Sequence, residues 1–160
     1  MIALGCPERW TRFKPLPQDI EERLQNLTPI FEREGVLLAY LFGSLAEKAK
    51  DKDKDRDSDR GIARKPGDVD LAILTGEGPA YRLWDAIAEV LGTERLDLVD
   101  LQNASPVLRF EVLRSGRPIY VSDEALKERY EMDTIHLYRD TAPMRRRQME
   151  YLRGRMVDLC

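Results

Sequence analysis

Hydrophobic residues recur along the chain with two periods, one typical of amphipathic helices and one typical of buried strands. Between residues 19 and 34 the apolar positions fall on one helical face, and Gly35 suits the end of a helix. Pro29 interrupts this pattern, because proline lacks the backbone donor that a helix interior needs. The sequence therefore predicts one bent helix or two short ones. The apolar face consists of Ile20, Leu24, Leu27 and Phe31.

Three short apolar runs predict the strands of a sheet. Residues 36–42 are apolar throughout, which is typical of a central strand. Residues 69–74 and 95–101 form the other two runs, and a helix over 81–91, stopped by Gly92, separates them. Strands that alternate with helices in this way indicate an α/β or α+β fold, with a short mixed sheet flanked by helices.

Near the end of the chain the sequence predicts one edge strand with a helix before it and a helix after it. Ser105 and Pro106 have the usual order of a cap and a first helical residue, for a helix that runs to about Arg114. Residues 118–121 begin with proline, which is tolerated on an edge strand. Ser122 is expected to cap the helix that follows.

The last part of the sequence, residues 123–155, predicts one long helix or two, with Pro143 as the break or kink. Arginines gather at its end. Cations are favoured at a helix C-terminus, so an ordinary structural role explains them. The functional alternative is docking to an acidic protein surface or to operator DNA.

Residues 47–67 differ from the rest of the chain, because positive and negative side chains alternate there with almost nothing to bury. Such a segment cannot offset its ordering entropy by apolar burial, so we expect a flexible, solvated loop. Its run of aspartates lacks the glycine and glutamate positions of an EF-hand, which argues against a calcium site. We predict an irregular arm over 1–17, a core over 18–121 that contains this loop, and a helical tail over 122–160.

Composition limits the classes of protein that the chain can belong to. Of its 160 residues, 42% are hydrophobic and 34% are charged, and the formal net charge is −3. These values suit one soluble domain without an overall attraction to nucleic acid or to anionic membranes. No apolar run is long enough to span a membrane, and the N-terminus lacks the features of a signal peptide. We therefore expect a cytoplasmic protein.

Cysteine and histidine are too rare to build a metal site of their own. Cys6 and Cys160 have neither zinc-site nor disulfide-framework spacing, and His136 is the single histidine. A bound metal would have to be held by carboxylates, which favours Mg²⁺ or Mn²⁺.

Carboxylates that could bind such a metal lie at the second and third predicted strands. Asp68 and Asp70 are two residues apart in an extended segment, so their side chains project from the same face. Asp97 lies inside the third apolar run, where a charge is costly unless something pairs with it. Three carboxylates brought close together repel each other unless a cation holds them. Asp100 faces the opposite way from Asp97 on an ideal strand, so we expect it to be structural.

A Gly43–Ser44 dipeptide follows the first strand and opens a short helix. Glycine lets backbone N–H groups approach a phosphate closely, a helix N-terminus favours negative charge, and the serine hydroxyl adds a donor. Taken singly, each of these signals has an ordinary explanation as a turn, a cap or a solvated strand end. Their combination and order suggest a metal that handles a phosphate.

The three motifs resemble those of the DNA polymerase β-type nucleotidyltransferase superfamily. They are Leu-Phe-Gly-Ser-Leu-Ala at 41–46, Asp-Val-Asp-Leu-Ala-Ile-Leu at 68–74 and Leu-Asp-Leu-Val-Asp-Leu at 96–101. The small size and the segment 138–152 are similar to the minimal nucleotidyltransferases (MNT) of bacteria and archaea, which are partners of HEPN-domain proteins. The resemblance covers about residues 20–155 and implies the polymerase β-like nucleotidyltransferase fold.

The resemblance also implies a mechanism. Gly43 and Ser44 would hold the triphosphate of ATP, and Asp68 and Asp70 would bind Mg²⁺. Asp97 would share a metal and help to deprotonate the acceptor hydroxyl. In HEPN/MNT pairs the enzyme is the antitoxin: it transfers AMP to a tyrosine of the HEPN toxin, an RNase, and releases pyrophosphate. Operator DNA enters only as a contact of the whole toxin–antitoxin complex.

Two other functions remain open at the level of the sequence. One is a small-molecule nucleotidyltransferase of the aminoglycoside-modifying type, against which the short helical tail argues. The other is a catalytically idle module that neutralises a toxin by contact alone, against which the three aspartates argue. The chain departs from the family in the long spacer over 45–67, which we expect to bulge out and leave the site competent. The alternative is that this loop covers the nucleotide or contacts the partner toxin.

Overall fold

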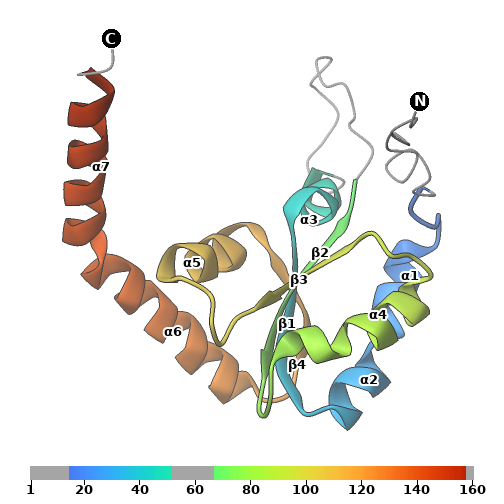
Figure 1. Cartoon of the computed structure of the whole chain (residues 1–160). Coiled ribbons are helices and arrows are strands. Elements are labelled where there is room, and N and C mark those ends of the chain that lie inside the picture. Colours follow the sequence, from blue (N-terminus) through green and yellow to red (C-terminus); the bar gives the residue numbers. More distant parts are fainter. Residues whose placement is uncertain (1–14, 52–66, 158–160) are drawn as a thin grey trace, which may run out of the picture.

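A four-stranded mixed sheet forms the middle layer of the molecule (Figure 1). The computed structural model describes residues 15–51 and 67–157. The strands lie in the order β3-β2-β1-β4, with β1 antiparallel to both of its neighbours and β2 parallel to β3. The predicted short mixed sheet is confirmed. The strands are β1 (Val36–Phe42), β2 (Val69–Thr75), β3 (Leu96–Asp100) and β4 (Arg117–Val121).

Helices cover both faces of this sheet, so the fold has three layers (Figure 1). On one face lie α1 (Ile20–Gln25), α2 (Thr28–Arg33), the 3₁₀ helix η1 (Ala80–Leu83) and α4 (Trp84–Leu91). On the other lie α5 (Pro106–Ser115) and α6 (Glu124–Asp140). Helix α3 (Gly43–Asp51) follows β1 directly, and its Leu45 and Ala46 are buried in the core. Helix α7 (Ala142–Val157) extends beyond the layers (Figure 1).

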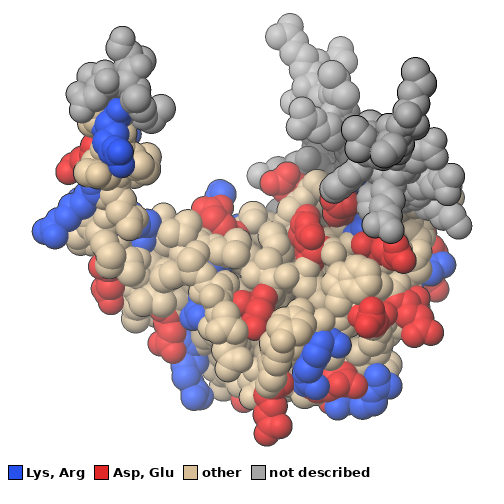
Figure 2. Space-filling view, in the orientation of Figure 1, with Lys and Arg blue, Asp and Glu red and all other residues tan. Residues whose placement is uncertain are grey.

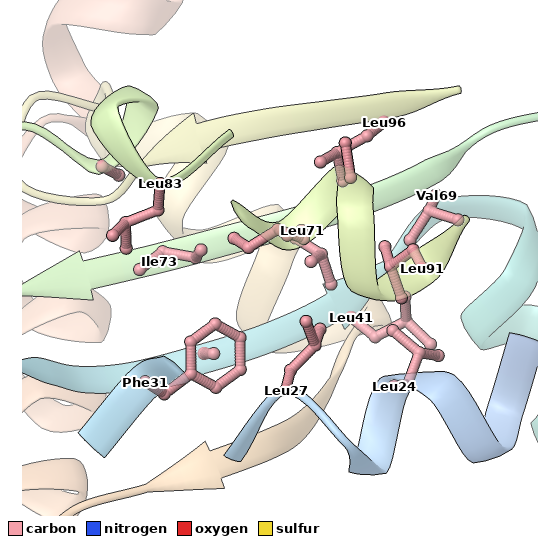
Figure 3. Packing of buried hydrophobic residues seen from close by; sticks show 14 of the residues in the cluster. Leu24, Leu27, Phe31, Leu41, Val69, Leu71, Ile73, Leu83, Leu91 and Leu96 are labelled. Atoms are coloured by element: carbon pink, nitrogen blue, oxygen red, sulfur yellow. The ribbon is translucent and has the colours of Figure 1, made fainter. Parts of the chain in front are cut away.

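The core is divided by the sheet, because successive side chains of a strand point to opposite faces. One set of strand residues packs against α1, α2 and α4, and Figure 3 shows how closely these side chains meet. The other set packs against α5 and α6. The first cluster includes Leu24, Leu27, Phe31, Leu41, Val69, Leu71, Ile73, Leu83, Leu91 and Leu96. The second includes Leu38, Tyr40, Ala72, Leu101 and Val112.

Two prolines divide predicted helices, as their chemistry requires. Pro29 lies in the first turn of α2, where its missing N–H costs nothing, so the predicted helix over 19–34 becomes α1 and α2. Pro143 lies just after the start of α7, and Thr141 separates this helix from α6. The end of the chain therefore forms two helices.

One predicted cap is wrong. Ser122 was expected to cap α6, but Asp123 does so, because its carboxylate accepts a hydrogen bond from the backbone N–H of Ala125. Aspartate and serine are both good caps, and the residue whose side chain reaches the first helical N–H groups takes the position.

Several expectations fall on residues outside the described ranges. Of the irregular arm predicted over 1–17, residues 1–14 are outside the described ranges. Of the charged loop predicted over 47–67, residues 52–66 are outside them, and these include most of its aspartate run. Among the helices of the described residues, none has the length and hydropathy that a membrane span needs.

Candidate active site

Two of the predicted carboxylates are direct neighbours across paired strands. Asp70 of β2 is in register with Asp97 of β3, and because these strands are parallel, both side chains lie on the same face of the sheet. That face is the one covered further along by α5 and α6, since Ala72 of β2 and Leu101 after β3 belong to the cluster beneath those helices. The pair stands at the end of the sheet that this cover does not reach.

Gly43 brings the start of α3 against this pair. It follows Phe42, the partner of Asp70 in the antiparallel pairing of β1 with β2, and has a left-handed φ of 70°. A Cβ placed on Gly43 would lie 2.2 Å from Oδ2 of Asp70. Glycine is required here both by the backbone conformation and by the close approach. Ser44 comes next and is exposed in the first turn of α3.

The three carboxylates influence each other's charge. Burial, the charge of Asp97 and then the charge of Asp68 raise the pKa of Asp70 to about 6. Negative charge has accumulated at this point of the protein without enough compensation. A divalent cation bound between the carboxylates would supply that compensation.

Asp68 has a partner of its own. Nε of Arg95 donates a hydrogen bond of 3.0 Å to Oδ1 of Asp68, and the two form an ion pair. Arg95 directly precedes β3, and its carbonyl accepts a hydrogen bond from the N–H of Val69. Arg95 is not among the site residues predicted from the sequence. Its position could have indicated a role in the site. Arg95 is two residues before Asp97 and directly precedes a strand whose first residue pairs with Val69, next to Asp68.

The carboxylate oxygens of the three aspartates are suitable ligands for a divalent cation. Asp68 has to move before all three can coordinate the same ion. In residues 15–51 and 67–157 no group of three or more His, Cys, Asp or Glu side chains is arranged so that it could hold a metal ion. Asp70 and Asp97 supply a pair of hard oxygen donors. Asp68 is turned toward Arg95 and would have to exchange this partner to become a third ligand.

Of the three site carboxylates, only that of Asp70 is partly buried. Asp70 is half-buried, whereas Asp68 and Asp97 are exposed. Because β3 is an edge strand, one side of it meets solvent. The cost of retaining an unpaired charge therefore applies to Asp70 and much less to its neighbours.

Two further contacts shape the third strand. The carboxylate of Asp100 accepts hydrogen bonds from the backbone N–H of Gln102 at 3.0 Å and from Nδ2 of Asn103 at 2.8 Å, so it stabilises the turn after β3. Nε1 of Trp84 donates to the carbonyl of Leu96 at 3.1 Å, directly before Asp97. Both contacts fix the backbone on either side of the site.

Solved structures with the same fold come from toxin–antitoxin complexes. One is the MNT antitoxin in complex with a tri-AMPylated HEPN toxin from Shewanella oneidensis, with 21% identity, coverage of 83% of this chain and 98% of that chain, and a TM-score of 0.61. Another, a toxin–antitoxin with AMP-PNP, has 23% identity, 81% and 97% coverage and a TM-score of 0.60. The MntA-HepT complex has 20% identity, 82% and 97% coverage and a TM-score of 0.60. These likenesses establish the fold. The comparison with curated proteins finds no match.

The match to a sequence family covers the site itself. The model of the family described as "Polymerase beta, Nucleotidyltransferase" matches residues 25–125, which is more than half of the chain. This segment contains the Gly43–Ser44 turn, Asp68, Asp70 and Asp97. With its mixed sheet, its helix start against Asp70 and its pair of carboxylates in register, the chain belongs to the polymerase beta nucleotidyltransferase family.

Proposed function

We propose that this nucleotidyltransferase is an Mg²⁺-dependent antitoxin enzyme that transfers AMP from ATP to a tyrosine of a partner HEPN toxin. The observation that carries the proposal is the meeting of Asp70, Asp97 and the start of α3 at one end of the sheet. A helix start favours phosphate, and the carboxylates favour the divalent cation that accompanies it.

We infer the roles of the residues from the family resemblance and from their positions. Backbone N–H groups at Gly43 and Ser44, with the serine hydroxyl, would hold the triphosphate. Asp68, Asp70 and Asp97 would hold Mg²⁺ or Mn²⁺, which when bound neutralises the phosphates and lowers the pKa of the attacking hydroxyl. Asp97 is exposed beside its partner strand, so it can accept the proton of an incoming hydroxyl.

The reaction forms one bond and breaks one. The tyrosine oxygen attacks the α-phosphorus of ATP, the bond from this phosphorus to the bridging oxygen breaks, and pyrophosphate leaves. The phenolic proton passes to Asp97 and from there to solvent. Modification of the tyrosine would silence the RNase.

The solved structures with this fold support the choice of nucleotide and acceptor. One contains an AMPylated HEPN toxin with its MNT antitoxin, and another contains AMP-PNP. This chain covers 98% of the matched chain in the first of these structures and 97% in the second. We therefore infer an acceptor supplied by a second protein, with operator DNA as a contact of the complex alone.

The proposal is tested by label transfer. The chain is incubated with Mg²⁺, ATP labelled at the α-phosphate and the product of the neighbouring gene, which the proposed function predicts to be a HEPN-domain protein. We expect label on a tyrosine of that protein, and its loss in the Asp68→Asn, Asp70→Asn double variant. Asp100→Asn is the matched control, because it removes a carboxylate charge from β3 while keeping an acceptor for the turn.

Two outcomes would contradict the proposal. Absence of transfer, with the toxin still neutralised by the double variant, would identify a module that acts by binding alone. Transfer to an aminoglycoside and not to the HEPN protein would identify a small-molecule enzyme.

A further inference from the structure

The last helix, α7, leaves the body of the protein. It packs chiefly against the end of α6, and its 16 residues extend about 24 Å. Figure 1 shows α7 standing well apart from α3, with α5 between the two in this view. In Figure 2 α7 is a narrow column, and a wide hollow separates it from the part of the body that carries α3.

The base of α7 is firmly attached. The guanidinium of Arg145 lies 3.9 Å from the centre of the Tyr138 ring, and this ring stacks on Phe110 of α5 with 4.0 Å between centroids. Nη1 of Arg145 also donates a hydrogen bond to the hydroxyl of Thr141. These contacts fix the direction in which the helix starts, so its outer turns are held away from the core.

Large apolar side chains along α7 are exposed to solvent. Four of them are more than half exposed, which is unusual for one helix of this length. An isolated helix of 16 residues is marginal in water and gains stability by covering an apolar face. The four are Met144 (60%), Met149 (53%), Tyr151 (64%) and Leu152 (53%).

The same helix is strongly basic, although the whole chain has a formal net charge of −3. It contains five arginines against one glutamate, Glu150. Among the ion pairs of the described residues, none includes an arginine of α7. A surface that combines exposed apolar groups with unpaired positive charge fits an acidic protein surface with an apolar groove.

A groove lies where the end of α6 meets α7. It has a volume of about 590 Å³ and is lined by Tyr138 of α6 and, on α7, by Ala142, Met149, three arginines (Arg145, Arg146 and Arg153) and the single glutamate, Glu150. It therefore offers apolar and positively charged contacts together. Because α5 and α6 cover the sheet face that carries Asp70 and Asp97, a partner seated here lies on the catalytic side of the molecule.

We propose that α7 is the docking arm for the protein that supplies the acceptor tyrosine, with Met149 and Arg153 contacting an acidic, partly apolar surface of that partner. This inference rests on the proposed function. Docking on the arm would place the partner over the hollow between α7 and the start of α3. Nucleic acid is the poorer match, because large apolar side chains interrupt the arginines and the rest of the chain is acidic.

The test compares two α7 variants with a control that has the same charge change as the first of them. Arg153→Glu and Met149→Asp alter the arm. Arg33→Glu alters an exposed arginine of α2, on the opposite side of the sheet, whose ion pair with Glu34 contributes little. Binding of the neighbouring gene's product, which the proposed function predicts to be a HEPN-domain protein, is measured by calorimetry. We expect Kd to rise about tenfold or more for each arm variant and less than about twofold for the control.

Kinetics separate docking from chemistry. KM for the HEPN protein should rise in the arm variants with kcat nearly unchanged, and ATP–Mg²⁺ binding by the chain alone should stay as in the wild type. If the wild type binds the HEPN protein without labelling it, the proposed function fails, and the Kd comparison still decides on the arm.

Other occupants give distinct results that would overturn the inference. Arm variants that bind the HEPN protein as tightly as Arg33→Glu does would remove α7 from the interface, as would a wild type that does not bind it. A dimer seen by sedimentation and dissociated by Met149→Asp would assign the arm to a second copy. Binding of a DNA duplex that Arg153→Glu abolishes, with HEPN affinity unchanged, would assign it to nucleic acid.

Discussion

Gly43 and Gly35 share a left-handed backbone and differ in their surroundings. Their φ angles are 70° and 68°, but a Cβ on Gly35 would meet no atom within 4 Å, whereas a Cβ on Gly43 would overlap the Asp70 carboxylate. Both alanine variants should lose about 1 kcal/mol of unfolding free energy from the backbone conformation. Gly43→Ala should lose more and should also abolish nucleotidyl transfer, because Asp70 must move.

Urea unfolding and label transfer measure the two effects. Equal stability and equal activity in the two variants would show that the close approach of Gly43 to Asp70 has no consequence.

Asp70 gives the protein a predictable dependence on pH. Burial and the neighbouring carboxylates raise its pKa from an ordinary 3.8 to about 6, so the fold favours its protonated form. Its contribution to stability is complete below about pH 4 and is lost as the pH rises through 6. In EDTA at pH 7.5, Asp70→Asn should therefore melt about 2–4 °C above the wild type, and the gap should close as the pH falls toward 4.

Differential scanning fluorimetry at both pH values checks this expectation. Asp100→Asn controls for the loss of one negative charge, and Mg²⁺ should raise the Tm of the wild type more than that of Asp70→Asn. A wild type that is the more stable protein at pH 7.5 in EDTA would contradict the assignment.

Among individual residues, the sequence was sufficient to predict which ones form the candidate site. It was less successful in predicting their burial and their ion pairs. The paired aspartates and the Gly43–Ser44 turn stood out because they follow or open apolar runs. Arg95 did not, because its ion pair with Asp68 joins residues 27 positions apart. The burial of Asp97 was overestimated, since an apolar run does not reveal that its strand lies at an edge.

At the scale of secondary-structure elements, the N-terminal cap of α6 gives a testable prediction about stability. Asp123 caps α6 through its carboxylate, and no hydrogen bond of the Ser122 side chain is recorded among the described residues. Asp123→Ala should lower the unfolding free energy by about 1 kcal/mol, whereas Ser122→Ala should change it by less than about 0.5 kcal/mol. Asp123→Asn should retain most of the stability, because asparagine is an equally good cap.

Chemical denaturation of the three variants distinguishes the caps. The prediction fails if Ser122→Ala proves the more damaging of the two alanine substitutions.

Proline and glycine made most element boundaries predictable. Pro29 and Pro143 divide the long helical patterns, and Gly92 ends α4 in a left-handed conformation. The first turn after Pro79 is a 3₁₀ helix where an α-helix was predicted. Periodicity of apolar residues hardly separates the two types over a single turn.

Over the whole molecule, α7 should be dispensable for folding. Its large apolar residues are mostly exposed, so a chain that ends after Thr141 should keep its Tm within about 2 °C. Calorimetry on the truncated and full-length chains measures this. A large drop in Tm would mean that the arm belongs to the core.

The arrangement of the strands was the least predictable part of the fold. The pairing of β1 with β4 joins segments about 80 residues apart, and no local pattern encodes that contact. The sequence therefore predicted a short mixed sheet but not its order. The order matters for the site, because it places Asp70 beside Asp97 and leaves β3 at the edge.

The indole of Trp84 gives this protein an intrinsic optical reporter. Its hydrogen bond to the carbonyl of Leu96 ends one peptide unit from Asp97, and Trp10 is the one other tryptophan of the chain. In a Trp10→Phe background Trp84 is the one tryptophan of the chain, so emission excited selectively from tryptophan arises from its indole. Mn²⁺ is paramagnetic and should quench that emission when it binds at the carboxylates, so occupancy could be followed by titration without label, partner or turnover.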